Sequence, residues 1–172
     1  MKIQEIEVKT IMTKTNLPVS DFAVNPYVGC THACKYCYAS FMKRFTNHPE
    51  PWGEFIDVKN WPAIRDRGQF RGKEAFFSSV TDPYQPHEAK YQRTRMILEQ
   101  LQGTGIKVSI STKSDLILRD LIEGWIIAMQ QMHIGDRWEV YIPAEMGYGK
   151  YAQPGIPGGS ALIFDIELLA IN

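Results

Sequence analysis

Short apolar runs separated by polar, turn-forming segments characterise the first two thirds of the chain. Residues 55–58 and 75–80 are two such runs, each short enough to be a buried strand. Over 86–101, apolar residues recur among Lys, Arg, Gln and Glu with helical character, and Gly103 gives a stop signal. Residues 106–111 are rich in β-branched side chains and predict another strand. A strand, a helix and a strand within about 35 residues are typical of a right-handed βαβ unit in a parallel sheet.

The last third of the chain has a different pattern. Residues 121–132 predict a short apolar helix, residues 137–142 a strand, and residues 143–160 a loop rich in Gly, Pro and Tyr. Within 162–169, every second position carries Leu, Phe or Ile, which is the period-two pattern of an antiparallel strand with one buried face. Parallel and antiparallel patterns in one short chain predict two architectures.

The composition is that of a folded protein, with 44% hydrophobic and 12% aromatic residues. Residues 1–24 are mixed and polar and are interpreted as a lead-in, whereas residues 39–45 predict a short helix. Nineteen basic and nineteen acidic side chains cancel, so no nucleic-acid partner is predicted from charge. No stretch approaches the roughly 20 apolar residues of a membrane-spanning helix, and no signal peptide is recognised, so we expect a cytoplasmic protein without a membrane partner.

All three cysteines lie in one short loop with the spacing C-x3-C-x2-C, at Cys30, Cys34 and Cys37. Such a cluster suits metal ligation in a reducing compartment better than a disulfide framework. Three thiolates on a cubane of four irons leave one iron open for an exogenous ligand. The alternatives are three buried reduced cysteines, or a zinc loop completed by His32.

The segment NPYVGCTHACKYCYA around these cysteines resembles the radical SAM superfamily, specifically its spore photoproduct lyase-like branch, which includes DNA-repair enzymes. The resemblance implies a [4Fe-4S] cluster on Cys30, Cys34 and Cys37, with S-adenosyl-L-methionine on the open iron. It also implies that Tyr36 lies near the adenine of that small-molecule cofactor. The expected activity is that of a lyase-like radical enzyme.

Two further segments resemble the same branch, SSVTDPYQPHE at 78–88 and STKSDLILRD at 111–120. By this resemblance Ser79, Asp82 and Lys113 help to bind S-adenosyl-L-methionine, with Lys113 opposite its carboxylate. Each segment also has a purely structural interpretation. Thr-Asp-Pro is good helix-start chemistry in any protein, and the lysine can be a solvated loop residue.

Residues 121–172, from LIEGW to the terminal LIFDIELLAIN, resemble the C-terminal half of FKBP-type peptidyl-prolyl isomerases. The resemblance implies a pocket for proline-containing peptides. Trp125 would form its floor, Ile122 would offer a backbone amide, Tyr148 a hydroxyl, and Phe164 a wall. The alternative is that Trp125 and Phe164 are ordinary core aromatics.

Neither resemblance is complete, so the chain is interpreted as an apparent chimera of two truncated domains. These are a partial radical SAM domain at 1–120 and half of an FKBP-like domain at 121–172. The expected fold class is α/β plus α+β: a partial, incomplete TIM-type barrel of parallel βα units, joined to a half FKBP-like antiparallel sheet with a short helix. The first expected function is binding of the cluster and S-adenosyl-L-methionine without full turnover. The alternatives are a peptidyl-prolyl cis-trans isomerase (rotamase) or proline-peptide binding module, and a non-functional hybrid.

Overall fold

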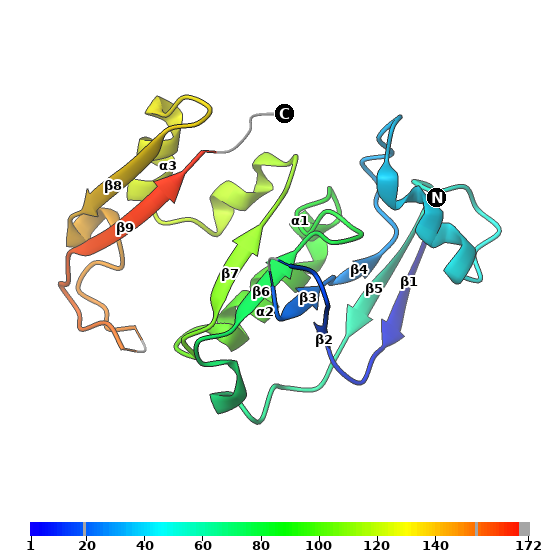
Figure 1. Cartoon of the computed structure of the whole chain (residues 1–172), viewed down its shortest axis with the longest axis horizontal. Helices are drawn as coiled ribbons and strands as arrows, with labels where there is room; N and C mark the ends of the chain where they lie inside the picture. Colours follow the sequence, from blue (N-terminus) through cyan, green and yellow to red (C-terminus); the bar gives the residue numbers. More distant parts are fainter. Residues whose placement is uncertain (19, 154, 169–172) are drawn as a thin grey trace. The chain divides into compact units, whose positions relative to one another are not determined.

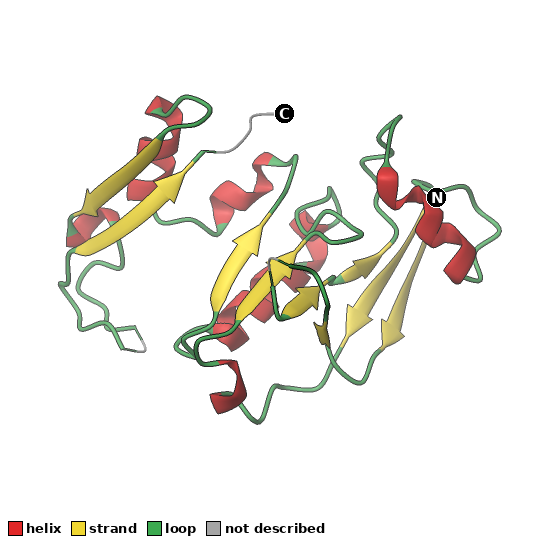
Figure 2. Ribbon diagram, in the orientation of Figure 1, coloured by secondary structure: helices red, strands yellow, loops and turns green. Residues whose placement is uncertain are grey.

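The computed structural model of the chain describes residues 1–18, 20–153 and 155–168. It is a small mixed α/β protein with several sheets and few helices (Figure 2). The chain forms two compact units, Met1–Leu116 and Ile117–Asn172. The sequence-based boundary lies at residue 120, four residues beyond the end of the first unit.

Two sheets make up the first unit (Figure 1). In one, the order is β1-β5-β4, with β1 parallel and β4 antiparallel to β5. In the other, the order is β2-β3-β6-β7, with β2 antiparallel to β3 and the remaining pairs parallel. The strands are β1 (Lys2–Glu7), β2 (Met12–Lys14), β3 (Phe22–Val24), β4 (Tyr27–Val28), β5 (Phe55–Asn60), β6 (Glu74–Phe77) and β7 (Lys107–Ile110).

The helical segments of this unit are short. They are α1 (Glu88–Tyr91), α2 (Arg93–Leu101) and the 3₁₀ helices η1 (Tyr38–Phe45), η2 (Gly68–Phe70) and η3 (Asp115–Arg119), the last of which crosses into the second unit. The single helix expected over 86–101 is therefore two, because Gln92 takes a left-handed conformation with φ of 51°. Parallel pairing of β6 with β7 around these helices confirms the predicted βαβ unit.

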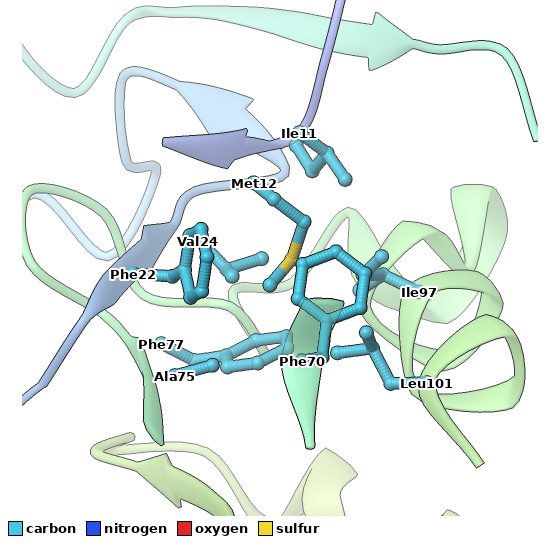
Figure 3. Close-up of a cluster of buried hydrophobic side chains, with 9 residues drawn as sticks. All are labelled: Ile11, Met12, Phe22, Val24, Phe70, Ala75, Phe77, Ile97 and Leu101. Carbon is cyan, nitrogen blue, oxygen red and sulfur yellow. The ribbon is translucent and has the colours of Figure 1, made fainter. Parts of the chain in front are cut away.

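The main core of the first unit lies between the four-stranded sheet and α2 (Figure 3). Ile97 and Leu101, one helical turn apart, bring α2 onto the sheet. Phe22 and Phe70 meet edge to face with ring centroids 5.4 Å apart. The complete set of buried members is Ile11, Met12, Phe22, Val24, Phe70, Ala75, Phe77, Ile97 and Leu101.

The predicted partial TIM-type barrel is wrong. A βα barrel requires strands that run parallel to both neighbours and close into one sheet. Here β2 and β4 run antiparallel to their partners, and the described strands fall into three separate sheets. The expected fold class is therefore replaced by a mixed α/β fold with several small sheets.

The lead-in predicted over 1–24 is also wrong, because it contains β1, β2 and β3. All residues of β1 except Ile6 are exposed, so the strand carries no clear hydrophobic alternation. Its position depends on main-chain pairing with β5, from Lys2 opposite Phe55 to Glu7 opposite Asn60. Such pairing is invisible to an analysis of side-chain pattern.

The second unit contains α3 (Glu123–Gln131), β8 (Arg137–Ile142), the 3₁₀ helix η4 (Ala144–Met146) and β9 (Leu162–Glu167). The two strands form an antiparallel pair in which Val140 lies opposite Phe164. Phe164 and Ile166 belong to the small core, and Leu162 is buried as well. The predicted alternation is thus confirmed as far as residue 168, and residue 169 lies outside the described residues. Ala128 and Met132 cover the sheet from the helix side.

Candidate functional site

The cysteine loop connects β4 to η1 and is a series of tight turns. The N–H of Ala33 donates to the carbonyl of Cys30 at 3.4 Å, and the N–H of Cys37 to that of Cys34 at 3.2 Å. Ala33 has a positive φ of 49°. All three thiols are free; Cys30 is buried, and the other two are partly exposed. The three cysteines therefore share one loop but not one environment.

Burial raises the pKa of the Cys30 thiol, and the charges of Asp82 and Cys34 act in the same direction. Backbone hydrogen bonds from Asp82 and His32 oppose this shift.

The radical SAM and iron–sulfur classification is corrected on structural grounds. Within residues 1–18, 20–153 and 155–168, no group of three or more Cys, His, Asp and Glu side chains is arranged to hold a metal ion. These residues therefore contain no metal-binding group, including one formed by the cysteine loop with His32. The [4Fe-4S] cluster and S-adenosyl-L-methionine as cofactors stay predictions.

Asp82 is nonetheless a point where three segments meet. Its Oδ1 accepts hydrogen bonds from the N–H of Tyr84 at 2.8 Å and the hydroxyl of Thr112 at 2.7 Å. Its Oδ2 accepts from the backbone N–H of Lys113 at 2.8 Å and lies 3.2 Å from Nε2 of His32. The carboxylate therefore holds together the cysteine loop, the turn before α1 and the segment after β7.

Among the described residues, Lys113 is the one other residue predicted to bind the cofactor that has a hydrogen bond to this carboxylate. The hydroxyl of Ser79 accepts a hydrogen bond from Nδ2 of Asn25 at 2.7 Å. Tyr36 is 90% exposed, with Nζ of Lys35 lying 5.7 Å from its ring centroid. Lys113 contacts Asp82 through its backbone N–H, which donates to Oδ2 of the carboxylate. The Asp82–Tyr84 hydrogen bond is a local turn, as the structural interpretation of this segment predicts.

In the second unit, Trp125 on α3 and Phe164 on β9 meet edge to face, with centroids 5.1 Å apart and ring planes at 82°. Both rings pack against the small core of that unit. The indole Nε1 of Trp125 is buried and has no hydrogen-bond partner in the described part of the chain. Ile122 precedes α3, and its carbonyl accepts from the N–H of Trp125 at 3.0 Å. Tyr148 lies on the long loop before β9, partly buried.

A cavity of about 290 Å³ in this unit escaped the sequence analysis. It lies between α3 and β8, and its lining includes Ile127, Trp138 and Met146 but none of the four predicted pocket residues. The signal that could have found it is Gly124. A Cβ atom at this position would lie 2.5 Å from Cγ2 of Ile142, so the glycine allows the close approach of helix and strand.

None of the helices among the described residues is long and apolar enough to span a membrane.

Comparison with known proteins gives two groups of relatives. The uncharacterized protein MJ0683 of Methanocaldococcus jannaschii is 39% identical over 122 residues, which cover 70% of this chain and 46% of the relative. The uncharacterized protein ORF301 of Acidianus two-tailed virus is 36% identical over 115 residues, which cover 58% of this chain and 36% of the relative. FK506-binding protein 4 of Aspergillus oryzae is 48% identical over 53 residues, which cover 31% of this chain and 11% of the relative. The chain spans less than half the length of each of these relatives.

A model of the family "FKBP-type peptidyl-prolyl cis-trans isomerase" matches residues 67–169, well over half of the chain. The match confirms the FKBP part of the predicted resemblance and extends it upstream of residue 121. It gives no support to a radical SAM segment. The chain belongs to the FKBP-type peptidyl-prolyl cis-trans isomerase family.

Proposed function

We propose that the second unit binds proline-containing peptides and accelerates cis-trans isomerisation of the X–Pro bond. The observation that carries the proposal is the contact between Trp125 and Phe164, two aromatic rings from different elements that both lie within the family match. Together they form an apolar corner beside the start of α3.

The chemistry requires little more than such an environment. The planar amide is stabilised by resonance, and rotation about it has a barrier of about 18–20 kcal/mol. In the twisted transition state the amide loses resonance and charge separation, so a water-poor apolar surface favours it over the planar ground state. Trp125 would serve as the floor under the proline ring, and Phe164 as a wall.

Two polar groups would orient the peptide in this pocket. The backbone N–H of Ile122 precedes the first turn of α3 and would donate to a peptide carbonyl. The hydroxyl of Tyr148 would donate a second hydrogen bond. Neither group moves a proton in the reaction, because isomerisation breaks no covalent bond.

The test uses the full chain and a tetrapeptide with a central Leu-Pro bond, whose cis-trans exchange is followed by NMR. The exchange should be faster than the uncatalysed reaction, which takes roughly tens to hundreds of seconds. Trp125→Leu should abolish the acceleration. The matched variant Trp138→Leu also replaces an indole by leucine in the second unit, but it should retain the acceleration. An uncatalysed rate with the wild-type chain, or equal rates for both variants, would overturn the assignment.

Peptide binding measured in the same samples separates the isomerase from a binding module. Broadened Leu-Pro resonances without faster exchange would indicate a binding module. Neither effect would indicate a hybrid without function.

A further inference from the structure

A second cavity lies in the first unit, and its lining includes no residue of the cysteine loop. Its volume is about 260 Å³. Its lining comes from the segment between Lys9 and Lys14, the segment between Trp61 and Phe70, and Phe22. The loop before η2 and the turn into β2 thus contribute to one cavity.

The floor of this cavity is the edge of the main core. Ile11, Met12, Phe22 and Phe70 all line it and are all buried members of the core cluster shown in Figure 3. Trp61 is partly buried against the same cluster. Aromatic rings attract other rings in offset or edge-to-face arrangements, so this floor suits a planar apolar group.

The rim carries an excess of positive charge. Lys9, Lys14 and Arg65 line the cavity, against a single carboxylate, Asp66. All four side chains are exposed, and in the described part of the chain none of the three cations has a carboxylate within salt-bridge distance. Like charges around a concave apolar surface focus the field on the space between them. An unpaired cationic rim above an apolar floor therefore favours an anion with an apolar body.

The size of the cavity limits what it can hold. Pockets for drug-sized ligands begin at roughly 300 Å³, so this space fits a smaller molecule. We propose that the cavity lined by residues 9–14 and 61–70 binds a single-ring aromatic anion, with its ring against the partly buried Trp61 and its phosphate or carboxylate group near Lys14 and Arg65. The site is independent of the proposed isomerase activity.

The experiment measures binding of phenyl phosphate to the full chain by calorimetry and by amide shifts in NMR. Inorganic phosphate and benzyl alcohol serve as the charge-only and ring-only probes. Phenyl phosphate should bind at least about tenfold more tightly than either, because only it uses both the floor and the rim. Shifts should concentrate on the amides of Thr10 and Gln69, which line the cavity.

Variants at exposed positions keep the core intact and test the rim. Lys14→Gln and Arg65→Gln should each weaken binding of phenyl phosphate about three- to tenfold and leave binding of benzyl alcohol unchanged. Lys107→Gln removes an exposed lysine of β7 outside the cavity and should have no effect. Equal affinity for phenyl phosphate and benzyl alcohol would overturn the proposal. An equal loss of phenyl phosphate affinity in Lys107→Gln, or NMR amide shifts confined to residues outside the cavity, would also overturn it.

Discussion

Cys30 lies in a different environment from the two cysteines that follow it in the loop. It is 8% exposed, and burial raises its pKa, whereas Cys34 and Cys37 are partly exposed. Alkylation requires both an accessible sulfur and a thiolate. We expect iodoacetamide to modify Cys34 and Cys37 at least about tenfold faster than Cys30 at neutral pH.

Mass spectrometry of the peptides at successive times measures these rates. In denaturant the rates should converge, which controls for local sequence. Equal rates in the native chain would contradict the burial of Cys30.

Glu88 is a buried carboxylate with a structural role at the start of α2. Its Oε1 accepts from the N–H groups of Thr94 at 2.9 Å and Arg95 at 3.2 Å, and its Oε2 accepts from the hydroxyl of Tyr27. Burial raises the pKa of Tyr27 above its ordinary value, and Glu88 adds to the shift, so this hydroxyl stays a donor. Glu88→Ala leaves these donors without that acceptor, and we expect a loss of about 2–4 kcal/mol in the free energy of unfolding of the first unit.

Urea unfolding followed by NMR signals of the first unit measures the loss. The matched control is Glu99→Ala on α2, which removes an exposed pair with Arg95 and should cost only about 0.3–0.5 kcal/mol. A cost of that size for Glu88→Ala would refute the capping role.

At the scale of elements, Asp21 joins the start of β3 to the start of β6. Its carboxylate accepts from the N–H of Glu74 at 3.0 Å and from Nζ of Lys73 at 3.2 Å. The hydrogen bond from Glu74 and then that from Lys73 lower the pKa of Asp21. A folded-state pKa below the unfolded value of about 3.9 gives stabilisation that is complete above the unfolded value and is lost as pH falls through the folded one.

Asp21→Asn should therefore lower the urea midpoint at neutral pH, and the difference should disappear in acid once the pH lies below the folded-state pKa of Asp21. Urea midpoints of the wild-type chain and of Asp21→Asn, measured from neutral pH into acid, test this prediction. A difference that persists unchanged into acid would point to a cause other than the charge.

The contact between α3 and β8 depends on Gly124. A Cβ atom there would lie within 2.8 Å of three side-chain carbons of Ile142. Gly124→Ala should destabilise the second unit by about 1–3 kcal/mol, as overpacking does. In Gly68→Ala the new Cβ would lie 3.8 Å from Oδ1 of Asp66, an ordinary contact, so this control should be nearly neutral.

Because the clash is with one side chain, Ile142→Ala should make Gly124→Ala less costly. A double-mutant cycle measures this coupling, expected at about 1 kcal/mol or more. Additive costs would exclude the direct contact.

For the whole molecule, the division into two units predicts where the chain is cut. The units meet at Leu116 and Ile117, within η3, which has no buried residue. Proteases cleave where backbone is exposed and lightly packed. We expect limited trypsin digestion of the native chain to cut first after Arg119, giving two fragments identified by mass. First cleavage inside α2 or β8 would contradict the division.

The sequence by itself determined the elements whose side chains carry a period. The strand at 137–142, the βαβ unit and the alternating face of β9 follow from burial of every second or every third to fourth residue.

Only the tertiary structure decided which strands pair and which side chains share a space. The exposed strand β1 is held by its main chain, and the antiparallel partners β2 and β4 rule out the expected barrel. The spacing of the three cysteines places them in one loop, but it could not show that Cys30 is buried while the other two are partly exposed. The physical reason is that a pattern along the chain encodes which groups avoid water, whereas distances between segments depend on packing of residues far apart in sequence.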